Sequence, residues 1–80
     1  MGLAKTEAEL AERAARFLKA ELKRADVTYA ELAKRLKKHG LAGETENSIK
    51  SKLARGTFAA TFLLACLAAL ELAGVSLEDI

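Results

Sequence analysis

The segment TENSIKSKLARG, residues 45–56, concentrates hydrogen-bonding and cationic side chains around very little apolar surface. Ile49 and Leu53 are its only large apolar residues, and at about 100° per residue they lie on one side of a helix. The side chains on the opposite side include Asn47, Lys50 and Ser51. Such groups can bond the edges of bases, with Asn suited to adenine and Lys to guanine. These three residues are the predicted base-reading set if the helix contacts duplex DNA.

Positive charge is concentrated around the same segment. Residues 34–55 hold seven basic and two acidic side chains, whereas residues 1–33 hold six of each and residues 56–80 hold three acidic ones. The net charge of +2 therefore understates a local cationic excess. Basic and hydroxyl side chains bind phosphate oxygens and position a protein on DNA without reading its sequence. The predicted backbone contacts are Thr28, Tyr29, Lys34, Lys37, Lys38, Lys52 and Arg55.

Helices are expected to position these residues. The composition favours helices, because Ala and Leu dominate and Pro is absent. Three threonines can cap helix starts: Thr6, Thr28 and Thr45. Thr28 is also predicted to form a capping box with Glu31, and Gly56 is a natural helix stop. The predicted helices span about 6–25, 29–38, 45–55 and 59–72, followed by a short turn at 76–80. The expected fold class is all-α, a four- to five-helix bundle.

The chain, residues 1–80, is predicted to be one domain, which at this size buries only about 60% of its unfolded surface. The expected core consists of Phe17, Leu32, Leu36, Ile49, Leu53, Phe58, Phe62, Leu63, Leu67 and Leu70. The fourth helix is apolar on nearly every side, which in so small a domain favours cover by a second chain. We therefore predict a homodimer through this helix and the tail. The predicted interface residues are Leu64, Leu67, Leu72, Leu77 and Ile80.

Several segments resemble one family. TYAELAKRL, residues 28–36, resembles the second helix of phage-repressor and Cro-like (XRE-type) helix-turn-helix domains, commonly T-x-x-E-L-A-x-x-L. IKSKLARG, residues 49–56, is similar to the end of their recognition helix, and LLACLAAL with GVSLEDI is similar to their fourth helix and tail. The resemblance covers about residues 17–80. The chain also resembles an uncharacterised bacterial family of short domains of this type, marked by LKAELKR, TYAELAKRL and TE-x-x-I…RG-x-F.

The resemblance implies a lambda-repressor-like fold and sequence-specific binding of double-stranded DNA by a dimer, as in a small bacterial or phage transcriptional regulator. In that fold the recognition helix lies in the major groove and the preceding helix crosses the backbone. The chain departs from the pattern twice. Residues 37–44 lengthen the connection between the second and third helices, and Ile49 and Leu53 are four apart where three is usual. Both departures affect how the third helix would enter a groove.

Three other interpretations fit parts of the pattern. Taken without the resemblance, the basic residues favour the solvated faces of an ordinary helical bundle over a DNA-binding surface. A helical protein–protein interaction module, an antitoxin-like or adaptor dimer without DNA binding, would use the apolar fourth helix. An anionic membrane surface could attract the basic block, but its short helices need their apolar faces for the core. A signal-peptide pattern is absent and the longest uncharged run, residues 56–70, is short for a membrane span, so a cytoplasmic location is expected.

Catalysis is not expected from this sequence. His39 and Cys66 are its only histidine and cysteine, and they lie in different segments. Burial in an apolar helix raises a thiol pKa and leaves the thiol inert, so Cys66 is predicted to be a small core residue. One His and one Cys also fall short of the four ligands of a structural zinc site. We predict no metal, no cofactor and no small-molecule ligand.

Overall fold

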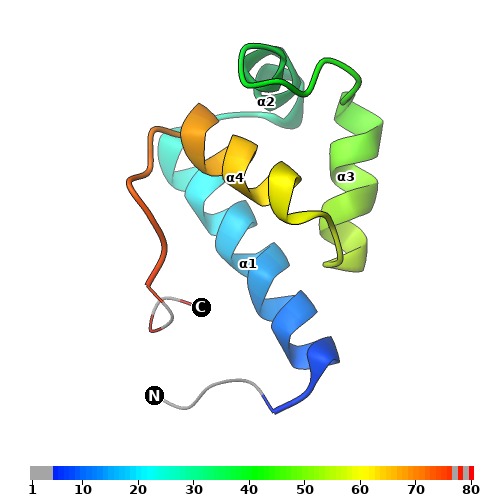
Figure 1. Cartoon of the computed structure of the whole chain (residues 1–80), viewed down its shortest axis with the longest axis vertical. Coiled ribbons are helices and arrows are strands. Elements are labelled where there is room, and N and C mark those ends of the chain that lie inside the picture. Colours follow the sequence, from blue (N-terminus) through cyan, green and yellow to red (C-terminus); the bar gives the residue numbers. More distant parts are fainter. Residues whose placement is uncertain (1–4, 77, 79) are drawn as a thin grey trace.

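The computed structural model describes residues 5–76, 78 and 80, and in this part of the chain it contains four helices and no strand. The helices are α1 (Glu7–Ala25), α2 (Tyr29–Lys37), α3 (Glu46–Arg55) and α4 (Ala60–Ala69). Figure 1 shows α4 crossing the long α1, while α3 stands beside them and α2 lies across the upper end. α3 packs against α1 and α2, and α2 also packs against α4. The predicted all-α class is confirmed.

The first three helices begin after the predicted threonines, Thr6, Thr28 and Thr45. Each hydroxyl accepts a hydrogen bond from the backbone N–H three residues on, at 3.1 Å in every case. A cap of this kind stabilises a helix by about 1 kcal/mol, because it satisfies a donor that the helix itself leaves free. The start of α4 lacks such a bond, since its N-cap is Ala59. Packing of Phe62, which is only 2% exposed, positions that end instead.

The reciprocal capping box forms at α3, not at α2 as predicted. In α2 the Glu31 carboxylate accepts from Nε of Arg35 at 3.2 Å, one turn along the same helix. That ion pair takes the carboxylate away from the backbone N–H of Thr28. In α3, Ser48 Oγ accepts from the backbone N–H of Thr45 at 2.8 Å and completes the box. The start of the candidate DNA-reading helix is therefore held from both sides.

The end of α1 follows from the predicted break at Asp26 and Val27. Asp26 has φ 57°, the left-handed conformation that reverses the chain after a helix. The backbone N–H of Val27 then donates to the Leu22 carbonyl at 2.9 Å. This turn carries the Val27 side chain into the core, where it is 7% exposed. Val27 was absent from the predicted core because its burial depends on the turn.

The core lies among all four helices, and its most deeply buried large side chains are Leu18, Leu32, Leu36, Ile49, Leu53 and Cys66. Full burial of such a side chain contributes about 1.5–3 kcal/mol to stability. Half of the predicted core is confirmed as buried: Leu32, Leu36, Ile49, Leu53 and Phe62. The other predicted members are half-buried: Phe17, Phe58, Leu63, Leu67 and Leu70. Two alanines of α4, Ala65 and Ala69, are buried where larger neighbours were expected.

α4 is shorter than predicted, ending at Ala69 rather than near residue 72. The chain reverses at Glu71, which has φ 58°, and the backbone N–H of Leu72 donates to the Leu67 carbonyl at 2.9 Å. Nη1 of Arg35 donates to the Ala69 carbonyl at 3.3 Å. α4 has no basic residue in its own last turn, so this guanidinium from α2 supplies the cation that favours a helix C-terminus. The end of α4 is thus set by a contact between helices.

Within the described residues, no individual helix combines the length and apolar character needed to cross a membrane. Only α3 and α4 taken together reach that length and composition, and the chain bends by 119° between them.

Candidate nucleic-acid interface

α3 is attached to the domain by one narrow side. Ile49 is 0% exposed and Leu53 is 1% exposed, and they are the only buried residues of this helix. The remainder of its outer surface is exposed, namely Glu46, Asn47, Lys50, Ser51, Ala54 and Arg55. The predicted base-reading residues therefore share an open face, as the helical spacing indicated. Their amide, ammonium and hydroxyl groups could all reach a partner outside the chain.

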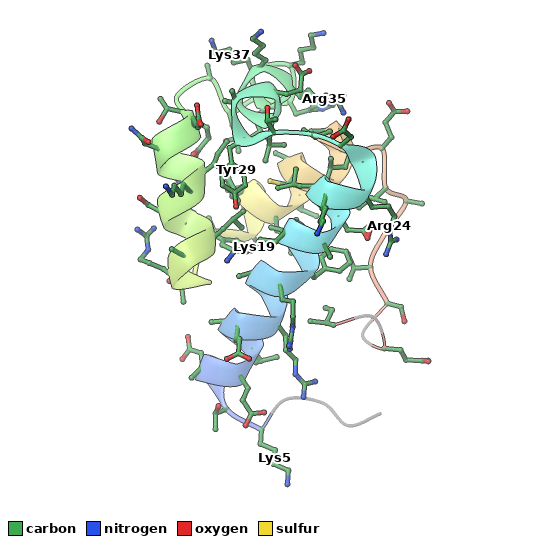
Figure 2. All side chains as sticks on the ribbon, turned by 180° about the vertical axis from the view of Figure 1, so that it is seen from behind. Lys5, Lys19, Arg24, Tyr29, Arg35 and Lys37 are labelled. Carbon is green, nitrogen blue, oxygen red and sulfur yellow. The ribbon has the colours of Figure 1, made fainter. Side chains whose placement is uncertain are left out.

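The predicted backbone contacts fall into two groups. Exposed ones are Thr28, Lys34, Lys37, Lys38 and Arg55. Tyr29 is half-buried and packs against the core, and Figure 2 shows it beside α3 on the side where Lys19 of α1 also lies. Lys37, at the end of α2, projects away from the body in the same view. The exposed cations thus occupy α2, the turn after it and the end of α3.

Lys52 belongs to the second group, because an ion pair inside the domain already holds it. Its Nζ lies 3.0 Å and 2.9 Å from the two carboxylate oxygens of Glu44. The same ammonium lies 5.5 Å from the ring centroid of Phe62, within range of a cation–π contact. Its side chain is 26% exposed and that of Glu44 is 14% exposed. We therefore leave Lys52 out of the proposed phosphate contacts.

Glu44 binds the long connection between α2 and α3 to the side of α3. Its carboxylate accepts from Ser48 Oγ at 2.7 Å as well as from Lys52, so one side chain links the connection to two turns of α3. Burial alone would raise the pKa of Glu44, but the hydrogen bonds from Ser48 and Lys52 and the charge of Lys52 together lower it. Sequence reasoning treated Glu44 only as a charge. The spacing of Glu44, Ser48 and Lys52, four residues apart at each step, was the available signal.

Replacing Glu44 with glutamine is expected to lower the free energy of unfolding at pH 7 by about 1 kcal/mol, because it removes a charge-assisted pair. A lowered pKa in the folded state gives stability that is present above pH 4.5, the ordinary value, and lost as the pH falls through the folded pKa. Urea unfolding between pH 7 and pH 3 should therefore show a shallower acid loss in the variant than in the wild type. Glu12→Gln, on an exposed carboxylate of α1 beyond the first turn of that helix, is the matched control. Parallel acid profiles for Glu44→Gln and the wild type would contradict this role.

Cys66 is 1% exposed, which confirms its predicted place in the core. Burial, with a smaller contribution from the negative charge of Glu44, raises the pKa of its thiol to about 12. A thiol in this state is a poor nucleophile. Among the described residues, no group of three or more His, Cys, Asp or Glu side chains is placed to hold a metal ion.

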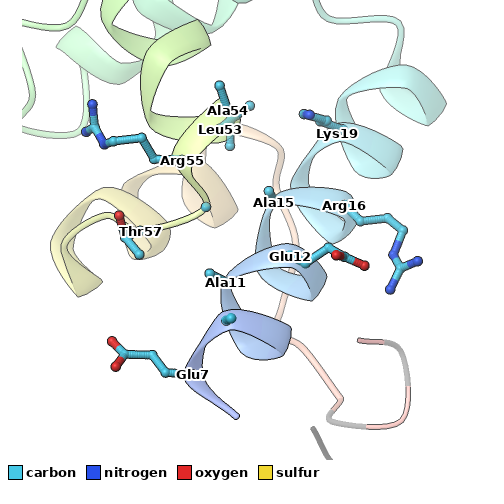
Figure 3. Close-up of a pocket in the computed structure, with 12 residues that line it drawn as sticks. Glu7, Ala11, Glu12, Ala15, Arg16, Lys19, Leu53, Ala54, Arg55 and Thr57 are labelled. Carbon is cyan, nitrogen blue, oxygen red and sulfur yellow. The ribbon is translucent and has the colours of Figure 1, made fainter.

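A groove of about 750 Å³ runs along the line where residues 7–19 of α1 meet the end of α3 (Figure 3). Its small residues include Ala11, Ala15 and Gly56. Lys19 reaches from α1 toward Leu53 and Ala54 of α3, whereas Arg16 and Arg55 point outward. Glu7 and Glu12 lie toward the other end of the groove. The groove therefore continues the open face of α3 onto α1.

A family model described as "Domain of unknown function (DUF6471)" matches residues 1–75. The chain belongs to this family. No curated protein and no solved structure matches it. An uncharacterised domain family was expected, and that much is confirmed. The helix-turn-helix resemblance of this DUF6471 domain stays a prediction.

The residues of the predicted dimer interface of the DUF6471 domain are only partly exposed to solvent. Leu64 is 64% exposed, whereas Leu67, Leu72 and Ile80 are half-buried. Leu72 and Ile80 line a cavity of about 430 Å³ beside α1, and Figure 1 shows the tail running back along that helix. Arg13 Nη1 donates to the Ile80 carbonyl at 3.4 Å. Leu77 lies outside the described residues, as does part of the predicted turn at 76–80.

Proposed function

We propose that this DUF6471 domain binds double-stranded DNA in a sequence-specific manner through α3, as a small bacterial or phage transcriptional regulator acting as a dimer. The observation that supports the proposal is the way α3 packs on the domain. Two residues, Ile49 and Leu53, hold it to the core, and the opposite face is exposed and polar. A helix that enters the major groove needs this arrangement, because DNA covers its outer face.

Charge supports the same partner. The exposed cations Lys34, Lys37, Lys38 and Arg55 lie on α2, on the turn after it and on α3. Phosphates on either side of a groove would meet such cations, and each contact releases counterions from the duplex. Glu46 is the one exposed acid on α3. It lies in the first turn, where a carboxylate stabilises the helix dipole and need not approach a phosphate.

Lys50→Ala tests the base-reading role. If Lys50 binds a guanine edge, the variant should lose about 1–3 kcal/mol of discrimination at one base position and keep its preferences elsewhere. A selection from a random duplex pool identifies the preferred site, and fluorescence anisotropy on single-base variants of that site measures the change. Lys5→Ala, on an exposed lysine at the start of α1, is the matched control. Equal loss on every duplex would assign Lys50 to the backbone, and no loss at all would remove α3 from the interface.

Protein–protein interaction without DNA binding is the second candidate function, and one observation favours it. Leu64 on α4 and Leu10 on α1 are the exposed large hydrophobic residues among those described, at 64% and 53%. Apolar side chains this open are common at protein interfaces. Sedimentation at tens of micromolar measures self-association, and a duplex titration beside it separates the two candidates. A dimer that does not bind duplex DNA would favour the protein–protein interaction function.

A further inference from the structure

The acidic and basic residues of α1 are segregated along the length of the helix. Residues 5–12 carry one lysine and three glutamates, whereas residues 13–24 carry five basic side chains and a single glutamate. The equal totals of residues 1–33 conceal this division. The cationic half of α1 begins beside the end of α3 and runs toward α2. Arg13 and Arg24 line the cavity beside the tail, whereas Arg16 and Lys19 line the groove next to α3. The positive surface of α2 and α3 therefore continues onto the side of α1 that carries these two residues.

Lys19 is the member of this cationic half that faces α3. It is exposed, and Figure 3 shows its side chain extending across the groove toward Leu53 and Ala54. Within the described part of the chain, no ion pair or hydrogen bond engages its ammonium, whereas Arg24 on the same helix pairs with Glu21 at 3.0 Å. Lys19 is thus an uncommitted cation beside the open face of α3.

We propose that the α1–α3 groove admits one sugar–phosphate strand of the duplex and that Lys19 binds a phosphate of that strand. This inference rests on the proposed function. A helix lying in a major groove about 12 Å wide has a phosphate strand on each side. The lysines of α2 would bind the phosphates of one strand. The groove of about 750 Å³ on the α1 side leaves room for the other strand. Lys is suited to this role, because it presents a compact charge on a flexible stem.

The acids of the groove set the direction of that strand. Glu7 and Glu12 lie toward the start of α1, away from Lys19. A strand that followed the groove toward them would meet repulsion. Phosphate contact is therefore confined to the Lys19 end, which adjoins the exposed face of α3. The contact positions α3 in register and carries no base information.

The test compares Lys19→Gln with Lys5→Gln on one duplex, by anisotropy titrations from 50 to 200 mM salt. Both variants remove one exposed lysine from the α1 region, but Lys5 lies at the far end of the helix (Figure 2). Loss of one phosphate contact should weaken binding about eightfold at 0.1 M salt and reduce the log–log salt slope by about 0.9. Lys5→Gln should change neither quantity. Lys19→Arg, which keeps the charge, should retain most of the affinity.

The outcomes separate this inference from the proposed function. Equal loss for Lys19→Gln across all duplex sequences, with a thermal midpoint near that of the wild type, supports a phosphate contact. If Lys19→Gln binds as tightly as Lys5→Gln while Lys50→Ala is impaired, the groove contact is wrong and the role of α3 stands. If the wild type itself binds no duplex at 50 mM salt, the proposed function fails and the inference fails with it.

Discussion

Replacing Gly56 with alanine is expected to lower the free energy of unfolding by about 3 kcal/mol, from two additive causes. Gly56 has φ 73°, a left-handed conformation that costs a residue with a Cβ roughly 1–2 kcal/mol. A Cβ at this position would also overlap the backbone carbonyl oxygen of Ala11 and lie 2.8 Å from its carbon. Backbone atoms cannot move aside as a flexible side chain can. The end of α3 would have to separate from α1.

Substitutions at two other glycines separate the cost of the left-handed conformation from the cost of the steric overlap. Gly40 has φ 92°, and a Cβ added there would have no atom within 4 Å, so Gly40→Ala should show the conformational cost alone. Gly43 has neither a positive φ nor a neighbour within 4 Å of such a Cβ, so Gly43→Ala should be close to neutral. Thermal unfolding measures the series. For a domain of this size 1 kcal/mol corresponds to about 4–8 °C, so Gly56→Ala should melt more than about 10 °C lower. A midpoint equal to that of Gly40→Ala would show that the helices do not approach this closely.

Gly56 also shows what the sequence could predict and what it could not. A glycine after LAR predicted the end of α3, because helix ends are local and chemical. The contact with Ala11 brings together residues far apart in the chain, and nothing near Gly56 encodes it. The exposure of Asn47 and Lys50 was predictable for the same local reason, since helical spacing alone places them opposite Ile49. Local chemistry therefore predicted the helix starts and the open face of α3.

The features that the sequence did not predict depend largely on contacts between elements. α4 ends at Ala69, whose carbonyl accepts from Arg35 of α2, and the chain beyond it turns back so that the half-buried Leu72 lines the cavity beside α1. The ion pair of Lys52 with Glu44 was not predicted, because the conformation of residues 38–45, which brings Glu44 to it, has no periodic signal. Lys19 was overlooked for another reason. Its charge was visible, but a sum over residues 1–33 cancelled it against acids at the other end of α1.

Duplex binding is expected to weaken about 150-fold between 50 and 200 mM salt if the exposed cations of α2, the following turn and α3 bind phosphates. They are Lys34, Lys37, Lys38 and Arg55. About four neutralised phosphates give a log–log slope near −3.6, because each contact releases close to 0.9 counterion. Lys52 is left out of this count since Glu44 already neutralises it. A contact from Lys19 would steepen the slope to about −4.5.

Fluorescence anisotropy with a fixed duplex, over at least four salt concentrations, measures this slope. Lys37→Gln and Lys38→Gln together should reduce its magnitude by about 1.8, whereas Lys5→Gln should leave it unchanged. The slope discriminates between the two candidate functions because an apolar interface through Leu64 releases no counterions from a duplex. A flat salt dependence, or no binding at 50 mM salt, would therefore favour the protein-interaction module. A steep slope that the double variant at Lys37 and Lys38 does not alter would show that these two lysines contact no phosphate, so the duplex would not cover the end of α2 and the turn after it.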